Sequence, residues 1–232
     1  MEKFRFGSVF YNGKPVGPDE PCSEEVLISI GDTHLGVALD WFPVFDKLVG
    51  PICCLGCSWR QLNRADYILG RPIRIDGKLY WCRSLSIGQN LTEPSEYNGI
   101  IKKVGASPDI WNYNGHWAWG QETMRANDNF GICRGGPGKN EFNYATINYS
   151  SDKIGFRPVL EPLQDSLIPD KSLIGKKLHL YMTHESVRGI LVDYSDYDLT
   201  VQLDAELHAE FPWAQPAGKE TIIDRSSIIW IG

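Results

Sequence analysis

Apolar and polar residues alternate in short runs along most of the chain, which is typical of half-buried β-strands. The clearest example spans residues 71–85, where two alternating runs flank Asp76-Gly77. This dipeptide suits the central positions of a type I′ turn, so the segment predicts a β-hairpin.

Helical spacing is less common in the chain. Ser58 is suited to cap a helix, because its hydroxyl can accept a hydrogen bond from the first turn. The residues after it place apolar side chains at helical spacing, at Trp59, Leu62 and Ala65. A second short helix is expected around residues 41–48. We interpret residues 1–58 as an N-terminal extension that packs on the following domain.

Two domains are predicted after this extension. Residues 59–162 are expected to form a domain of long loops over a small sheet, because their second half is rich in Trp, Asn and Gly. Residues 163–172 are interpreted as a linker bounded by prolines. In residues 173–232 apolar positions such as Leu178, Leu180 and Met182 alternate with polar ones, which predicts a small, strongly bent β-barrel.

Two motifs in the middle of the chain resemble a known family. Cys133-Arg134-Gly135-Gly136 contains an Arg-Gly-Gly turn, and Ile154-Gly155-Phe156-Arg157-Pro158-Val159-Leu160 reads as a closing strand. Together they resemble the C-terminal half of a C-type-lectin-like domain, in the branch of the formylglycine-generating enzymes and related phage and bacterial domains. The resemblance implies a scaffold that displays loops, and a phage or prophage origin. A scaffold indicates architecture more than ligand.

The last sixty residues carry a second resemblance. Gly189, Leu191, Tyr194 and Tyr197 stand where the first motif of the Sm-like family has Gly, Leu and two aromatic residues, and residues 224–229 resemble its second motif. The predicted fold class is therefore α+β. It comprises a C-type-lectin-like domain with an N-terminal extension, followed by a small all-β Sm-like or SH3-like barrel.

Composition narrows the class of protein. With 232 residues, 42% hydrophobic and 22% charged, the chain is long enough for two cores. We expect no transmembrane helix, because the longest apolar runs have the length of strands. Residues 1–6 contain charges and no continuous apolar stretch, so we expect no signal peptide and a location in the cytoplasm of a bacterial host or on a virion. A formal charge of −6 argues against broad nucleic-acid binding, which depends on many Lys and Arg contacts to phosphate.

The six cysteines do not complete a metal site in the sequence. Free thiols are expected, because the chain is large and carries no secretory signal. Cys53-Cys54-Leu55-Gly56-Cys57 supplies half of a tetrahedral zinc site, so zinc and buried thiols both remain open for this loop. Formylglycine-generating enzymes hold copper with two thiolates after the Arg-Gly-Gly turn, and residues 137–149 contain no cysteine. We therefore expect no cofactor and no metal, and that oxidoreductase activity is disfavoured.

The strongest candidate for ligand binding is an aromatic run followed by an Arg-Gly-Gly turn. Indole rings stack on sugars or bases, and neighbouring polar groups orient a ligand. The candidate residues are Trp111, Trp117, Trp119, Gln121, Glu122 and Arg134. The alternative is that the tryptophans are core residues. Arg157 is expected to be a buried guanidinium bound to backbone carbonyls or a carboxylate.

The predicted barrel offers a second candidate. By its resemblance, Tyr197 stands where RNA-binding relatives have a base-stacking aromatic residue, and Arg225 where they have a cationic or polar residue. Residues 166–232 contain six Lys and Arg against ten Asp and Glu, a formal charge of −4, which repels phosphate. Homo-oligomerisation by pairing of edge strands is an equal alternative.

We expect a non-catalytic binding protein that recognises a glycan or a protein surface and does not interact with membranes. The alternatives are an oligomer that sequesters a small nucleotide signal in host-defence evasion, and RNA binding through the barrel. The remaining, disfavoured alternative is an enzyme, an oxidoreductase of the formylglycine-generating type.

Overall fold

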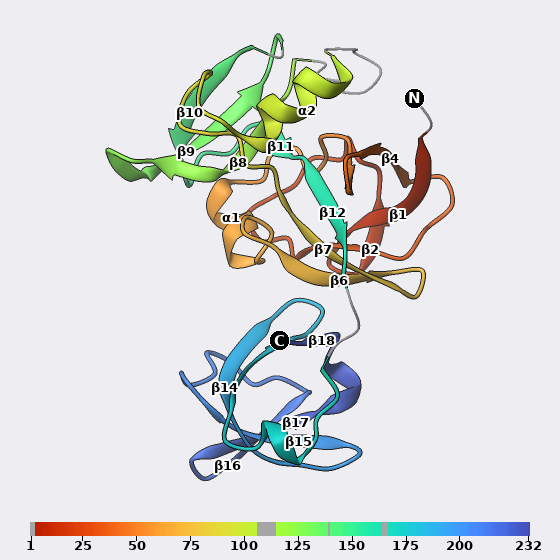
Figure 1. The fold of residues 1–232 in the computed structure, drawn as a ribbon, viewed down its shortest axis with the longest axis vertical. Helices are drawn as coiled ribbons and strands as arrows, with labels where there is room; N and C mark the ends of the chain where they lie inside the picture. The colour runs from red at the N-terminus through yellow and green to blue at the C-terminus, as the bar shows by residue number, and fades with distance from the viewer. Residues whose placement is uncertain (1–2, 106–114, 139, 164–166) are drawn as a thin grey trace. The chain divides into compact units, whose positions relative to one another are not determined.

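The computed structural model describes residues 3–105, 115–138, 140–163 and 167–232. The chain divides into two compact units, residues 1–163 and 164–232, and both are built mainly from curled antiparallel sheets (Figure 1). Strands account for 46% of the structure and helices for 10%, so β-pairing rather than helix packing sets the fold. No helix in the described ranges is long and apolar enough to cross a membrane.

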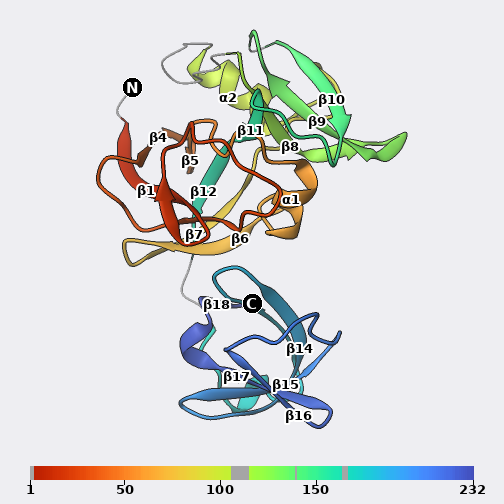
Figure 2. The ribbon, with the colours of Figure 1, turned by 180° about the vertical axis from the view of Figure 1, so that it is seen from behind.

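The first unit contains an eight-stranded sheet, a four-stranded sheet and two helices. The elements of the larger sheet are β1 (Phe4–Tyr11), β2 (Lys14–Val16), β3 (Ile28–Gly31), β4 (Ala38–Val44), β5 (Lys47–Val49), β6 (Arg71–Ile75), β7 (Lys78–Ser84) and β12 (Pro158–Pro162). Its order is β2-β1-β4-β5-β12-β7-β6, and β3 also pairs with β1. The strand β12 therefore joins the N-terminal strands to the β6–β7 hairpin, and it lies beside β7 in both views (Figure 1, Figure 2).

The smaller sheet has the order β10-β9-β8-β11. Its strands are β8 (Trp117–Met124), β9 (Asn127–Gly135), β10 (Phe142–Thr146) and β11 (Ile154–Phe156), and the helices are α1 (Trp59–Arg64) and α2 (Glu96–Val104). The motif expected as one closing strand is divided at Arg157. Its first half pairs in parallel with β8 and its second half joins the larger sheet, so this residue connects the two sheets.

Two local predictions are confirmed. The β6–β7 hairpin turns at Asp76 and Gly77, whose φ angles of 48° and 80° are the positive values that a type I′ turn requires. The hydroxyl of Ser58 accepts a hydrogen bond from the Gln61 backbone N–H at 3.1 Å and caps α1.

The helix expected at residues 41–48 is wrong, because these residues form β4 and β5. The strand β4 is buried on both faces: Trp41 packs in one hydrophobic cluster and Phe42 in another. A strand buried on both sides has a continuous apolar run, which periodicity cannot distinguish from a buried helix. Residues 1–58 are also not a separate extension, since β1 to β5 belong to the same sheet as β6, β7 and β12.

The second unit is one curled antiparallel sheet of six strands around its own core. The strands are β13 (Lys177–Tyr181), β14 (Ser186–Tyr194), β15 (Asp198–Leu203), β16 (Ala214–Ala217), β17 (Glu220–Asp224) and β18 (Trp230–Ile231), in the order β16-β17-β15-β14-β13-β18. Two 3₁₀ turns complete it, η1 (Lys171–Leu173) and η2 (Arg225–Ser227).

Gly189 allows the bend of this sheet. A Cβ atom at this position would lie 2.4 Å from the Gln202 carbonyl oxygen on the paired strand, which no larger residue can tolerate. The register of β14 against β15 also shifts between Leu191 and Asp193. Close backbone approach and a β-bulge both increase strand curvature, so they explain how so few strands enclose a core.

Candidate functional site: an aromatic cleft on the smaller sheet

A cleft of about 350 Å³ opens on the smaller sheet of the first unit. We call it the aromatic cleft, and it is lined by Trp117, Cys133, Asn143, Tyr144, Ala145, Tyr149, Ser151, Lys153 and Ile154. These residues come from β8, β9, β10, β11 and the segment that joins β10 to β11. Three aromatic side chains therefore line one small site.

Backbone pairing on two sides fixes the position of Trp117. Its N–H donates to the Lys153 carbonyl at 2.7 Å, and the residue pairs with Ile154 of β11 and with Gly135 of β9. The indole lies against Gly136, where an added Cβ would come within 2.4 Å of the ring. Gly136 has a φ of +66°, so glycine serves both the turn and the close approach of the indole.

The two tyrosines are the accessible part of the cleft. Tyr144 is 51% exposed and stands on β10, where its ring meets Phe130 edge-on at 5.9 Å. Tyr149 is 49% exposed and follows a turn in which its N–H donates to the Thr146 carbonyl at 2.8 Å. Half-exposed rings held by backbone bonds offer preformed flat surfaces, at low entropic cost, to a ligand that can stack.

Polar groups border these rings. Oδ1 of Asn143 accepts a hydrogen bond from the Tyr144 N–H at 2.9 Å, which leaves the amide N–H groups as donors toward a ligand. Ser151 accepts from the Lys153 N–H at 3.2 Å and so orders the segment that carries the lysine. The ammonium of Lys153 is exposed and adds one positive charge to the site.

The cleft carries little that could act in catalysis. Its lining residues, all within the described ranges, include no carboxylate and no histidine. Burial raises the pKa of Cys133 to about 12, so this thiol is protonated at neutral pH and behaves as a packing residue. Stacking and hydrogen bonding are the chemistry that this arrangement supports.

Of the predicted binding residues, Trp117 lines the cleft, whereas three others have structural roles. Trp119 is 1% exposed and donates from Nε1 to the Cys57 carbonyl at 2.9 Å. Arg134 is 2% exposed and lies 4.2 Å from the centre of the Tyr97 ring. Glu122 accepts hydrogen bonds from the Ser86 hydroxyl at 2.7 Å and from the Ile87 N–H.

The remaining members of the predicted loop add little to the site. Gln121 is half-buried and its N–H donates to the Leu85 carbonyl at 3.1 Å. Trp111 lies outside the described residues. The expectation for Arg157 is confirmed, because it is 1% exposed and donates to the Gly50 carbonyl at 3.0 Å. All six cysteines are free thiols.

Tyr197 and Arg225 are brought together in the second unit. The Arg225 N–H donates to the Tyr197 carbonyl at 2.8 Å, its guanidinium donates to the Ser195 carbonyl at 2.6 Å, and the Tyr197 ring is 79% exposed. Both line a cavity of about 580 Å³ together with Asp196, Asp198, Asp224 and Ser226. Three carboxylates against one guanidinium repel a phosphate, so this cavity is poorly suited to RNA or to a nucleotide.

Tyr144, Tyr149 and Lys153 were not predicted as site residues from the sequence. The signal that could have found them is the repeated Asn-Tyr pair, Asn143-Tyr144 and Asn148-Tyr149, in a segment too polar for a core strand. Comparison with known proteins gave no matching family model, no matching curated protein and no matching solved structure.

Proposed function

We propose that the first unit is a non-catalytic carbohydrate-binding domain and that the aromatic cleft is its binding site. One observation carries the proposal: Trp117, Tyr144 and Tyr149 line a single cleft, and two of these rings are about half exposed. The C–H faces of a sugar ring are apolar and pack on aromatic faces, while its hydroxyl groups need donors and acceptors at the border of the site. The cleft supplies both.

Its size and polarity favour a sugar over the other ligands considered. A volume of about 350 Å³ is near the lower end for small-molecule sites and suits roughly one or two sugar rings better than a folded protein surface. Lys153 carries the only formal charge among the described lining residues. A sugar with a carboxylate would pair with this ammonium, so we propose a preference for acidic over neutral sugars.

The resemblance of Cys133-Arg134-Gly135-Gly136 and of residues 154–160 to C-type-lectin-like domains supports the same proposal. Lectin-like scaffolds display ligand-binding segments on a rigid frame. In this chain the frame includes the buried Arg134 and Arg157, and the segment from Asn143 to Lys153 displays the exposed rings.

The test is a screen of the full chain against neutral and acidic oligosaccharides, followed by titration calorimetry of the hits. Tyr144→Ala and Tyr149→Ala should each weaken binding by about tenfold or more, which corresponds to about 1.4 kcal/mol or more. Both tyrosines are half exposed, so the melting temperature should change little. Lys153→Met should remove the preference for acidic sugars and leave neutral binding nearly unchanged.

Tyr197→Ala is the control, because it removes an exposed tyrosine, 79% exposed, from the other unit. It should leave sugar binding intact. If Tyr197→Ala abolishes binding while the two cleft variants do not, the site assignment is wrong and the cavity of the second unit is the binding site. If all variants bind equally, the cleft is not used.

A further inference from the structure

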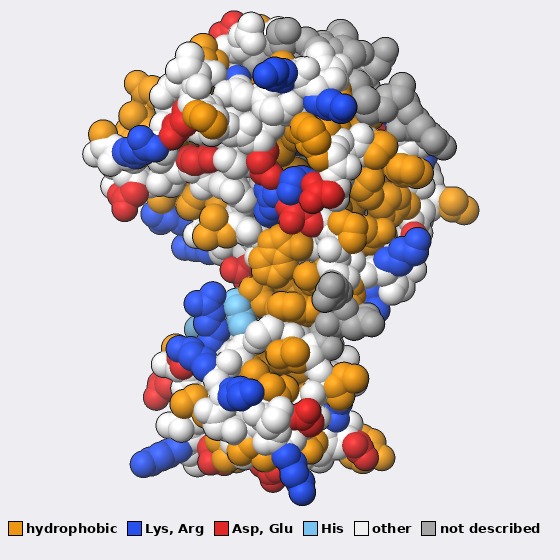
Figure 3. Space-filling view, in the orientation of Figure 1, with side chains coloured by type: hydrophobic (Ala, Val, Ile, Leu, Met, Phe, Trp, Pro, Cys, Tyr) orange, Lys and Arg blue, Asp and Glu red, His pale blue; other side chains and the backbone are white. Residues whose placement is uncertain are grey.

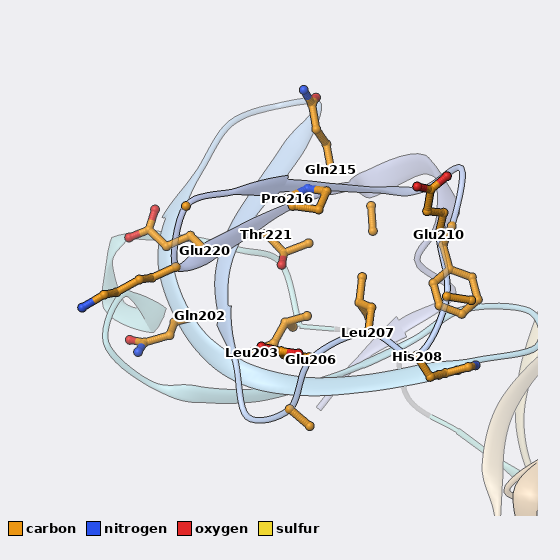
Figure 4. Close-up of a pocket in the computed structure, with 16 residues that line it drawn as sticks. Gln202, Leu203, Glu206, Leu207, His208, Glu210, Gln215, Pro216, Glu220 and Thr221 are labelled. Carbon is orange, nitrogen blue, oxygen red and sulfur yellow. The ribbon is translucent and has the colours of Figure 1, made fainter.

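The second unit contains a groove of about 930 Å³ between the segment that follows β15 and the β16–β17 hairpin (Figure 4). We call it the hairpin groove. Residues 205–211 line one side, and residues 214–216 and 218–221 line the other. It lies in a different unit from the aromatic cleft, so any function it has is additional to carbohydrate binding.

The middle of the groove is apolar. Leu203, Leu207 and Pro216 line it, and Leu203 also packs against the core of the unit. Toward one end Phe211 stacks on Trp213 with ring centres 4.8 Å apart and meets His208 edge-on at 5.1 Å. The groove therefore offers an apolar floor and, near one end, an aromatic surface that attracts cations.

Carboxylates lie at both ends of this floor. Figure 4 shows Glu220 at one end and Glu210 at the other, with Glu206 between them. Lys219 is the only lysine or arginine in the lining, so three carboxylates against one ammonium give a formal charge of −2. Within the described part of the chain, no ion pair involves any of the three glutamates.

Thr221 places a hydrogen-bonding group in the groove. The residue is 8% exposed, yet the structure gives its hydroxyl no hydrogen-bond partner among the described residues. Figure 4 shows this hydroxyl directed into the groove, toward Leu203 and Leu207. The hydroxyl is not among the fully buried polar atoms that lack a partner, so it is accessible from the groove, and a ligand amide can replace the water that solvates it.

We propose that the hairpin groove binds an extended peptide segment of a partner protein, with an apolar side chain between two basic ones. The apolar side chain lies on Leu203, Leu207 and Pro216, and the basic side chains reach Glu210 and Glu220. A backbone amide of the peptide bonds to the Thr221 hydroxyl. The groove is too negative for an acidic or nucleotide ligand, and a small cation would leave its apolar floor exposed to water.

The probe is a fluorescein-labelled Gly-Lys-Ala-Leu-Ala-Arg-Gly peptide, titrated onto the full chain by fluorescence anisotropy. We expect saturable binding that weakens as salt is raised, because exposed ion pairs are screened. The same peptide with Glu in place of Lys and Arg should not bind. Glu210→Gln and Glu220→Gln should each raise the Kd by roughly three- to tenfold at low salt, while Glu185→Gln, outside the groove, should not.

Thr221→Val tests the hydroxyl, with Thr200→Val on the neighbouring strand β15 as its matched control. Thr221→Val should raise the Kd by about fivefold, the value of one neutral hydrogen bond, and should leave the melting temperature unchanged or higher. Thr200→Val should leave the Kd unchanged. A Thr221→Val protein that melts lower and binds equally well would overturn the proposal, because the hydroxyl would then serve the fold.

Two further outcomes would replace the proposed occupant. If spermidine displaces the peptide at equal concentration and its own binding needs the same glutamates, the groove is a polyamine site. If the chain dimerises and Glu210→Gln or Glu220→Gln restores the monomer while no peptide binds, the occupant is a second copy. Loss of sugar binding in the Tyr144 and Tyr149 variants tests a different unit, so the two proposals can fail separately.

Discussion

Arg83 holds together a half-buried group of charges in the first unit. From β7 its guanidinium donates to both carboxylate oxygens of Glu96 at 2.6 Å and from Nε to Glu161 at 2.9 Å. Lys47 lies 2.9 Å from the same Glu161 and 3.4 Å from Glu96. Figure 3 shows charged side chains of both signs close together on this face of the unit. The group links β5, β7, α2 and β12.

We predict that Arg83→Met lowers the free energy of unfolding of the first unit by about 2–3 kcal/mol at pH 7. Methionine keeps an unbranched side chain but removes every donor. Lys47 then remains as the cation beside Glu96 and Glu161, and the Ser86 N–H still donates to Glu96. Removing one partner of a buried ion pair costs about 3–5 kcal/mol. The carboxyl side chains are 24% and 31% exposed and Lys47 remains, so the expected cost lies below that range.

The loss of stability in Arg83→Met should depend on pH. Burial opposes ionisation of Glu96, but the hydrogen bonds from Arg83 and from the Ser86 N–H outweigh it, so the pKa of Glu96 lies below its ordinary value of 4.5. A lowered pKa stabilises the fold above the ordinary value, and this contribution is lost as the pH falls through the folded pKa. The difference between wild type and Arg83→Met should therefore be full above about pH 5 and should shrink as the pH falls further.

Urea unfolding followed by tryptophan fluorescence measures the stability of the first unit, because six of the eight tryptophans precede residue 164 and report on that unit. Arg125→Met is the control: its ion pair with Glu93 has the arginine side chain 77% exposed, so it should cost less than about 1 kcal/mol. A deficit for Arg83→Met that is the same at pH 7 and pH 4 would refute the reasoning, since the loss would then come from packing. The reasoning would also be refuted if Arg125→Met lowered the free energy of unfolding as much as Arg83→Met.

Three further predictions concern the frame of the molecule. Trp119→Ala should lower stability by about 3–5 kcal/mol in urea unfolding, because it empties a core position and leaves the Cys57 carbonyl without its donor; a loss below 1 kcal/mol would contradict its core role. Ser58→Ala should cost about 1 kcal/mol through the lost cap of α1, whereas Ser58→Asp should restore most of it. Residues 164–232 expressed alone should give a β-type circular dichroism spectrum with a cooperative thermal transition, and an unfolded spectrum would show that their core needs the first unit.

The elements predicted correctly from sequence depend on local chemistry. Asp76-Gly77 determined its hairpin because both residues adopt positive φ, which few other dipeptides tolerate. Ser58 signalled the start of α1 because the cap bond spans only three residues. In both cases the interactions that fix the conformation lie within a few positions along the chain.

The parts that could not be predicted depend on contacts between distant residues. The strand β4 looked helical because Trp41 and Phe42 face different cores, and the second core exists only when β12 and α2 are in place. Likewise Trp117 and Trp119 share one face of β8, yet one lines a cleft and the other is fully buried. Alternation gives the face of the strand, but burial of Trp119 depends on a distant segment, whose Cys57 carbonyl accepts its indole N–H.

Contacts between distant residues also explain why the candidate site differs from the predicted one, and Arg134 is the example. As part of an Arg-Gly-Gly turn it suggested a surface anion ligand, but its guanidinium packs on Tyr97 and donates to Asn98 at 3.3 Å and to the Ile87 carbonyl. Both Tyr97 and Asn98 belong to α2, so the arginine fastens that helix to β9. Arg134 is therefore not available to bind a ligand. Exposed aromatic rings of the smaller sheet, Tyr144 and Tyr149, lie on the outer strand β10 and on the segment after it. The carbohydrate site is proposed there for this reason.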